Sequence, residues 1–384
     1  MRTKIFVTAA FSILVFASQL HAELPSAAKV VMTDSSASAL AKTKRVAITN
    51  VMVSFQASAG GEKTNTSGLF AAKSDASSSL QMPEMDTKLL ADITDAIYAQ
   101  LKADLQANGF EVVPEATVLA SPSYQKMIKA VGITNPSKFA NFNGDVMLVG
   151  ASGLKPYLPY NAETGKFGAS PKSLIKGWVT TSWGVKSSTE GGPTSTGTGE
   201  AYELPGLEVA LAKDLNANLV KATYVVTLGS AKANVERFTG THQDIHGNTG
   251  FSSTHTGSAF AQAGLLAGQS RIAFRTPAAS TKGESASLGY MANFGSNAAA
   301  AKDGDVVVTL AESLAGGTDF FSVSGGEKAA GGLEKFLLGK ALGGTGADTQ
   351  FEFTATIADP AAYRTEVVGM IKQARRDMLA LVKQ

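Results

Sequence analysis

The residues best suited to chemistry are three histidines and an aspartate in one short window. His242, Asp244 and His246 alternate along the sequence, and His255 follows after a segment that contains glycine. Alternate residues of an extended strand lie on one face, so two imidazoles and a carboxylate would be brought together. Zinc and other divalent ions accept these ligands, and His255 could complete a set of four. The sequence therefore offers a candidate metal site at His242, Asp244, His246 and His255.

Two simpler interpretations of this window stay open. Histidines in a polar, exposed strand and loop can act only as hydrogen-bonding groups, and a histidine cluster can sense pH without a metal. Other catalytic patterns are absent from the sequence, which has no Gly-x-Ser-x-Gly elbow and no Gly-Lys-Ser/Thr phosphate loop. We predict no catalytic residue and no cofactor beyond the alternative of a divalent metal such as zinc. The glycine clusters are interpreted as turns: Gly316-Gly317, Gly325-Gly326, Gly331-Gly332 and 343–346.

The first 22 residues have the three-part pattern of a secretory signal. Arg2 and Lys4 supply positive charge, 5–16 is mostly apolar, and a short stretch with small residues ends at Ala22. The apolar run is too short for a permanent membrane helix, which needs about 20 residues. We predict cleavage after Ala22, with Ala17 as the alternative, and a mature protein in the periplasm or outside the cell.

Composition narrows the classes of partner. The 384 residues include no cysteine, which excludes disulfides and a lipid attached behind the signal. The chain carries 34 basic and 32 acidic residues, and removal of Arg2 and Lys4 leaves 32 of each. A neutral chain without a basic block argues against nucleic acid or an anionic membrane as partner. No later segment is apolar enough to span a membrane, so we expect a soluble mature protein.

Alternating strand and helix patterns predict a layered α/β unit in the first half of the chain. Asp86 and Ser121-Pro122 are expected to start helices, since both are favoured at helix N-termini. A further helix is predicted from Leu207 to Leu219. The other predicted elements are strands 45–55, 110–113, 145–150, 222–228, 271–274, 305–310 and 350–357, and a closing helix after Asp359-Pro360.

The predicted fold class is α/β or α+β, with a β-rich second half that is rich in Gly, Ser and Thr. After the signal we expect a flexible leader at 23–43. An α/β module at 44–230 carries an inserted Gly/Ser-rich hairpin region, with a hairpin around 174–185. Residues 231–384 form a β-rich region closed by the C-terminal helix. The segment 57–79 is predicted as a long loop or a loose hairpin.

Two segments in the first half carry a family resemblance. They are LKADLQANGFEVVPEATV at 101–118 and GDVMLVG at 144–150. Together they resemble the α/β module of CsgG-like (curli-secretion-channel) and TolB N-terminal-like envelope proteins, over 44–150 and 205–230. The resemblance implies an envelope protein that binds other proteins or helps to assemble something, and it implies no catalytic residue. The channel proteins are lipidated, whereas this chain has no cysteine.

These observations favour an exported, non-enzymatic envelope or secreted protein that acts by protein binding or assembly. Its expected partners are other envelope proteins or further copies of itself. One alternative is a metal-binding protein or metal-dependent hydrolase that uses His242, Asp244 and His246. Another is a self-associating cell-surface or matrix protein, which the weakly charged composition favours.

Overall fold

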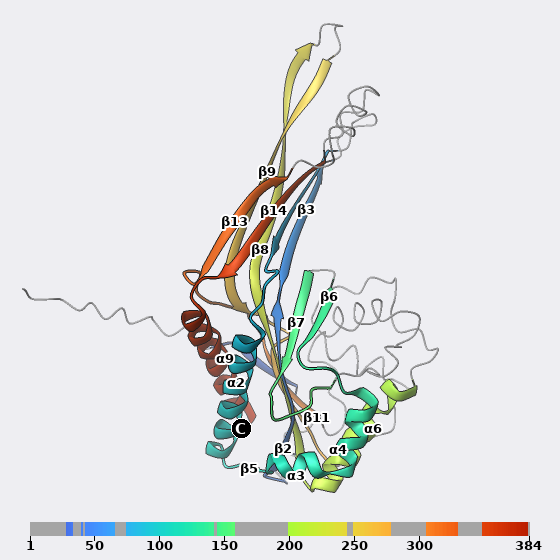
Figure 1. Ribbon diagram of the computed structural model, residues 1–384. Helices are drawn as coiled ribbons and strands as arrows, with labels where there is room; N and C mark the ends of the chain where they lie inside the picture. Colours follow the sequence, from blue (N-terminus) through green and yellow to red (C-terminus); the bar gives the residue numbers. More distant parts are fainter. Residues whose placement is uncertain are drawn as a thin grey trace, which may run out of the picture.

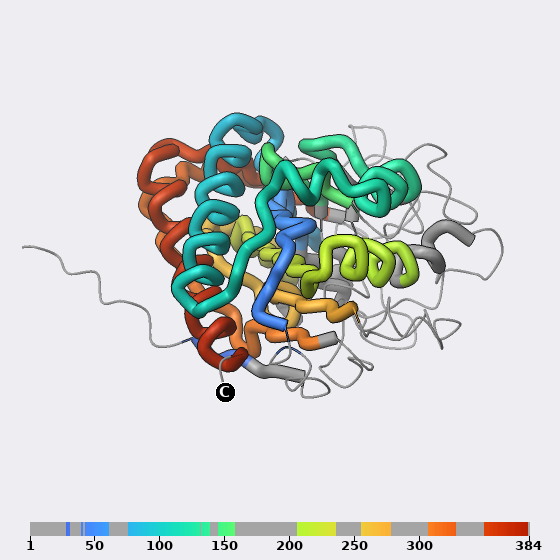
Figure 2. The backbone as a smooth tube through the Cα atoms, turned by 90° about the horizontal axis from the view of Figure 1, so that it is seen from below, coloured from blue at the N-terminus to red at the C-terminus, as the bar shows by residue number. Residues whose placement is uncertain are grey.

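The computed structural model describes residues 28–33, 40, 43–65, 74–141, 144–157, 199–243, 249–277, 305–328 and 348–382. Within these ranges the chain forms two β-sheets, and helices cover both faces of the larger one (Figures 1 and 2). The predicted class, mixed α and β with a closing C-terminal helix, is confirmed. The predicted signal at 1–22 and the hairpin around 174–185 lie outside the described residues.

The larger sheet has ten strands and forms the centre of an α/β body. Three strands lie off the main path of the sheet: β5 (Glu111–Val112) pairs with β2, β9 (Thr249–Leu265) pairs with β8, and β12 (Leu314–Ala315) pairs with β9. Its main path runs in spatial order through β1 (Val30–Thr33), β11 (Asp305–Leu310), β10 (Arg271–Arg275), β8 (Asn218–Gln243), β2 (Arg45–Gln56), β7 (Gly144–Gly150) and β6 (Ser137–Asn141).

Strand β2 lies in the middle of this sheet, parallel to β8 and antiparallel to β7. All of its residues are buried except Arg45 and Gln56 at its ends, which are half-buried. A strand that is covered on both faces has an almost continuous apolar sequence. This is why the sequence pattern predicted β2 well. The predicted strand at 45–55 is therefore confirmed.

Two helical layers enclose the larger sheet. Helices α2 (Thr87–Ala107) and α9 (Pro360–Val382) lie side by side on one face, and α3 (Glu115–Ala120), α4 (Pro122–Val131) and α6 (Gly199–Leu215) lie on the other (Figure 2). The buried stripe of α2 has the three- and four-residue spacing of an amphipathic helix. Its fully buried members are Leu90, Ile93, Ile97, Leu101 and Leu105.

The predicted helix starts at Asp86, Ser121 and Asp359 are confirmed by side-chain caps. The Asp86 carboxylate accepts from the backbone N–H groups of Lys88 at 2.9 Å and Leu89 at 3.1 Å. Ser121 Oγ accepts from the Tyr124 N–H at 3.4 Å. Asp359 accepts from two backbone N–H groups of α9, each at 3.0 Å. Each cap satisfies donors that a helix start leaves without an intrahelical partner.

The smaller sheet has four strands, in the order β13 (Phe321–Lys328), β14 (Asp348–Ile357), β4 (Ser74–Gln81) and β3 (Ser58–Asn65). It packs against the long hairpin of β8 and β9, which rises from the α/β body (Figure 1). Ala231 on β8 and Ala261 on β9 meet Leu80 on β4 and Ala355 on β14 in a shared core. Strands β3 and β4 confirm the hairpin alternative for 57–79.

The predicted helix from Leu207 to Leu219 is too long. Helix α6 ends at Leu215, Asn216 takes a left-handed φ of 45°, and Leu219 belongs to β8. The four-residue leucine spacing crosses a helix end, so the periodicity indicated one element where the chain forms two. An asparagine adopts the left-handed conformation more readily than most residues, which allows the chain to turn directly into the strand.

Three further expectations are corrected. Residues 30–33, within the predicted flexible leader, form β1 and pair antiparallel with β11; the sequence there begins with two valines, and β-branched residues favour strands. Gly325-Gly326 lies inside β13 instead of a turn, and a Cβ at Gly325 would come within 2.2 Å of the Glu352 carbonyl oxygen. The division predicted between 230 and 231 falls inside β8. Gly331-Gly332 and 343–346 lie outside the described residues.

Candidate functional site

The predicted histidine site falls at the far end of a long β-ribbon. Strands β8 and β9 pair antiparallel from Val226 opposite Leu265 out to Gln243 opposite Thr249. The outer part of this ribbon extends beyond the smaller sheet (Figure 1). His242 lies at the end of β8, opposite Gly250. Asp244 and His246 belong to the connection between the strands and lie outside the described residues.

The strand register places His255 away from His242. His255 pairs with Val235, whereas His242 pairs with Gly250, five residues before His255 on β9. At 3.4 Å per residue this is a separation of about 17 Å along the strand, whereas zinc ligands lie about 2 Å from the metal. The His255 ring nitrogen Nδ1 instead contacts Thr349 Oγ1 of β14. The structure therefore does not bring His255 into one site with His242.

A smaller metal site made by His242, Asp244 and His246 stays a prediction. In the described part of the chain, no group of three or more His, Cys, Asp or Glu side chains is arranged to hold a metal ion. Elemental analysis of the purified chain beside its His242→Ala/His246→Ala variant tests this site. Equal and negligible metal in both proteins would exclude it.

A buried charged cluster that the sequence analysis missed lies between α6 and the larger sheet. The Glu208 side chain is fully buried, and its Oε1 lies 2.7 Å from Lys221 Nζ. Its Oε2 lies 3.6 Å from Arg275 Nη1, and the Arg275 side chain is only 3% exposed. Lys221 on β8 and Arg275 on β10 project from the same face of the sheet. The cluster thus ties a helix to two strands by charge.

Tyr157 connects this cluster to β2. Its hydroxyl donates to Glu208 Oε1 at 3.4 Å and lies 3.0 Å from Thr49 Oγ1, while Asn50 Nδ2 donates to the Tyr157 carbonyl at 2.9 Å. Burial, and then the nearby Glu208 charge, raise the pKa of Tyr157 well above its ordinary value. The phenol therefore stays protonated at neutral pH and serves as a donor. A fully enclosed arrangement of this kind supports structure, because no substrate reaches it.

A sequence signal for this cluster does exist. Lys221 interrupts the apolar run LVKATYVV, and Arg271 and Arg275 flank the apolar centre of RIAFR. Charged residues at inward positions of apolar strands are rarely buried unless they are paired. The pattern therefore predicts an acidic partner, although the sequence does not identify Glu208 as that partner.

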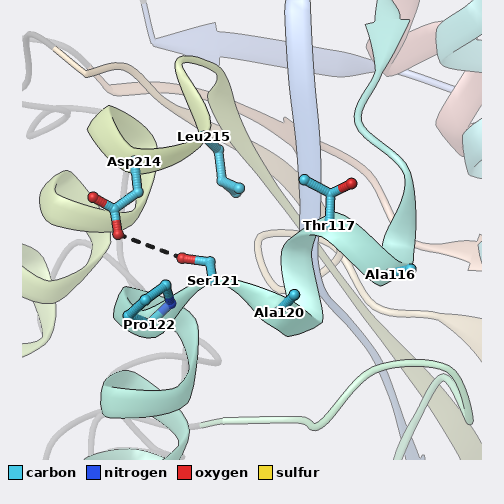
Figure 3. Close-up of a pocket in the computed structure, with 7 residues that line it drawn as sticks. All are labelled: Ala116, Thr117, Ala120, Ser121, Pro122, Asp214 and Leu215. Atoms are coloured by element: carbon cyan, nitrogen blue, oxygen red, sulfur yellow. Dashed lines mark hydrogen bonds between the residues drawn. The ribbon is translucent and has the colours of Figure 1, made fainter.

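A shallow pocket of about 610 Å³ lies where α3, α4 and α6 meet (Figure 3). Small side chains and Asp214 line it, and Asp214 Oδ2 accepts from the Ser121 hydroxyl at 3.5 Å and from the Ser123 hydroxyl. Asp214 is the one ionisable side chain among the residues that line the pocket. It places negative charge at the N-terminus of α4, which the helix dipole favours.

The remaining prominent feature is a set of open strand edges on the projecting part of the molecule. Within the described residues, β13 and β3 end the smaller sheet. On its side away from β8, β9 pairs with β12 at Leu265 and Gly264, and Ala263 exchanges backbone hydrogen bonds with Gly316 and Gly317. An open edge presents backbone N–H and C=O groups that can pair with another chain. These edges form the candidate interaction surface.

Comparison of the chain with protein-family models, curated proteins and solved structures gave no match. No helix among the described residues has the length and apolar character needed to cross a membrane. Any statement about function therefore rests on the geometry and chemistry of the chain itself.

Proposed function

We propose that this chain is an exported, non-enzymatic envelope or secreted protein that acts by binding other proteins or by assembling with its own copies. The observation that carries the proposal is the ribbon of β8 and β9, which extends beyond the smaller sheet that packs against its base (Figure 1). The ribbon and the open edges beside it are the surface through which the chain acts.

A projecting two-stranded ribbon has a physical reason to seek a partner. Two strands alone are only marginally stable in water, because they bury little apolar surface and leave both outer edges without backbone partners. A further strand that pairs with such an edge supplies main-chain hydrogen bonds and covers one side of the ribbon.

The sequence supports the same proposal. The pattern of the first 22 residues is that of an export signal, and the neutral mature chain disfavours nucleic acid as partner. The described residues offer a buried charged cluster and a shallow pocket, and neither has the groups of a catalytic site. The resemblance of 44–150 and 205–230 to an envelope-protein module points to the same compartment.

Shortening the ribbon tests this function. Val235 and His255 are directly opposite each other, so an Asn-Gly turn can replace 236–254 and join them. Cross-linking of cells should capture partners or oligomers with the full-length chain and lose them with the shortened one. The urea midpoint should be almost unchanged, because the main core includes none of the removed residues. A full-length variant with the exposed Glu312→Gln change is the matched control and should keep every cross-link.

Cell fractionation with the same strains tests the compartment, and the protein is expected outside the cytoplasm. Two results would contradict the proposal: reproducible turnover of a hydrolase substrate, or identical cross-linking of the full-length and shortened chains.

A further inference from the structure

The outer edge of β9, on the side away from β8, differs from the other open edges of the molecule. β9 has 17 residues, and its sequence contains no Asp, Glu, Lys, Arg or Pro. Proteins usually protect an edge with a charge, a proline or a very short strand. Both margins of the smaller sheet have charges, since β3 and β13 each contain the sequence Gly-Gly-Glu-Lys. In the larger sheet, β6 contains Lys138 and β1 has only four residues. The edge of β9 is therefore the longest one, among the described strands, that lacks protection against pairing.

The chain itself begins a third strand beside β9 and then leaves this position. β12 pairs antiparallel with the base of β9. The Ala263 N–H donates to the Gly317 carbonyl at 3.3 Å, and the Ala263 carbonyl accepts from the Gly316 N–H at 2.8 Å. The chain then turns away and enters β13 at Phe321. From Gln262 outward, no described strand pairs with this edge of β9.

This open side of β9 lies beneath β13, which forms the margin of the smaller sheet (Figure 1). Three residues of β9 lie against residues of β14 at a constant offset along the sequence. The pairs are His255 with Thr349, Gly257 with Phe351, and Ala261 with Ala355. On its other side β9 pairs with β8, which contacts β3, whereas β9 contacts β13. The ribbon therefore places β9 under β14 and, within the described residues, no strand under β13.

Alternate residues of β13 face this open position. Val323, Gly325 and Glu327 lie opposite inner-face residues of β14 and so share the inner face of the smaller sheet. All three are exposed, and Val323 is 41% exposed. Among the described residues, Glu327 has no ion-pair partner. An exposed valine and a free carboxylate thus lie above an unprotected strand edge.

We propose that an extended segment of a partner protein pairs antiparallel with β9, as a third strand of the ribbon beneath β13. This inference rests on the proposed function, because it names the edge that binds the partner and the sequence that this edge accepts. Main-chain hydrogen bonds to β9 supply affinity, and the inner face of β13 selects side chains. The segment continues the line of β12 outward and follows β9 into the projecting part of the ribbon.

The residues of β13 define the side chains that the segment needs. Every second residue of a strand points to the same face, so three alternate residues of the segment meet β13. The residue beneath Val323 is apolar, and the residue beneath Gly325 is large, because an aromatic ring covers the backbone that a glycine leaves exposed. The chain uses this match internally, since a Cβ at Gly257 would lie 2.0 Å from Phe351 Cγ. The residue beneath Glu327 is Lys or Arg, because it meets a carboxylate.

A synthetic peptide with this pattern tests the pairing. The probe is Thr-Val-Thr-Phe-Thr-Lys-Thr with a fluorophore at one end. Fluorescence anisotropy at physiological salt should show saturable binding to the full-length chain, with a dissociation constant below about 1 mM. The chain shortened at 236–254 keeps the part of β9 beneath β13 and should bind the probe equally well. A partner in cells follows the whole of β9, so it should still need the outer ribbon.

Charge reversal tests the contact with Glu327. Glu327→Lys should raise the dissociation constant of the probe at least about threefold, because an attractive charge pair becomes a repulsive one. A probe with Glu in place of Lys should show the opposite preference and bind Glu327→Lys more tightly than the unchanged chain. Glu352→Lys is the matched control, since Glu352 is exposed on β14 and alternates with its inner-face residues. Its effect should be less than about twofold, because salt screens separated surface charges.

The outcomes separate this inference from the proposed function. If the probe does not bind while the full-length chain still captures partners that the shortened chain loses, the β9 pairing is overturned and the proposed function stands. Equal weakening by Glu327→Lys and Glu352→Lys also overturns the pairing, because it indicates unspecific attraction of charge. If the chain alone sediments as a dimer that Glu327→Lys dissociates, a second copy occupies the edge and the partner segment is overturned. A chain that binds no probe and captures no partner in cells contradicts both.

Discussion

The α/β body and the projecting β-structure are built in different ways. In the body, large side chains from the sheet and from α2 and α9 fill the core, among them Phe55, Ile97, Tyr224 and Phe274. In the projecting part, four of the seven buried members of the core between the smaller sheet and the ribbon are alanines. Alanine buries much less apolar surface than leucine or phenylalanine, and hydrophobic stabilisation scales with that surface.

This difference shows where the chain keeps its stability and where it is suited to association. The body is enclosed, and it buries charged side chains as ion pairs, as at Glu208 and Lys221. The projecting part depends on strand pairing, contains many small polar residues and presents open edges. A mutation in the body should therefore act on folding, whereas a mutation in the projecting part should act on partners.

Replacing Glu208 by Gln should have the largest effect on folding. The change leaves Lys221 and Arg275 buried without their carboxylate, and loss of one member of a buried ion pair costs about 3–5 kcal/mol. Urea unfolding followed by circular dichroism measures the loss. The control is Glu312→Gln, whose partner Lys29 has a side chain that is 70% exposed. A change of less than about 1 kcal/mol is expected there, and equal losses in both variants would contradict the structural role of the cluster.

The second prediction compares the two regions directly. Ile97 is fully buried between α2 and the sheet, so Ile97→Ala should lower the free energy of unfolding by about 2–5 kcal/mol. Val323→Ala removes a side chain that is 41% exposed, and a loss of less than about 1 kcal/mol is expected. Both are measured in urea at low protein concentration. Similar losses would mean that the projecting sheet is as tightly packed as the body.

Alkaline pH should act on the body through its buried tyrosines. Burial raises the pKa of Tyr124 to about 12, raises that of Tyr224 to about 12, and raises that of Tyr363 above its ordinary value. A raised pKa in the folded state gives stability that is complete below the unfolded value near 10 and is lost as the pH rises through the folded value. Strands β3, β4, β13 and β14 contain no tyrosine.

Each buried tyrosine should cost the body up to about 1.4 kcal/mol per pH unit above pH 10. The urea midpoint, measured between pH 9 and 11.5, should fall less steeply for Tyr363→Phe than for the unchanged chain. Burial is the cause of the raised Tyr363 pKa, so phenylalanine removes the titration and keeps the packing. Identical slopes would show that Tyr363 does not titrate in this way.

Local signals in the sequence predicted most elements of the body. The caps at Asp86, Ser121 and Asp359 and the buried run of β2 are visible in short windows, and the structure confirms them. Predictions from short sequence windows were wrong where one element follows another without a break, as at Asn216. They were also wrong where an element depends on a partner that is distant in the chain, as β1 depends on β11. The prediction of a turn at Gly325 was also wrong, because this glycine lies in β13, where it pairs with β14.

The candidate sites also depend partly on local sequence and partly on long-range packing. The alternation of His242, Asp244 and His246 is a property of the sequence, but the distance of His255 from His242 follows from the register of β8 with β9. Glu208 meets Lys221 and Arg275 only because α6 packs on that face of the sheet. Such contacts depend on long-range packing, which no short window contains.

The sequence by itself determined the charge balance, the absence of cysteine, the helix caps and the alternating pattern of the α/β body, because composition and neighbouring residues decide these properties. Only the tertiary structure decided that the second half returns to the central sheet, that a ribbon projects from it, and that Val323 lies on an open edge. Strand pairing joins residues far apart in the chain, and which edges stay open depends on the whole set of pairings.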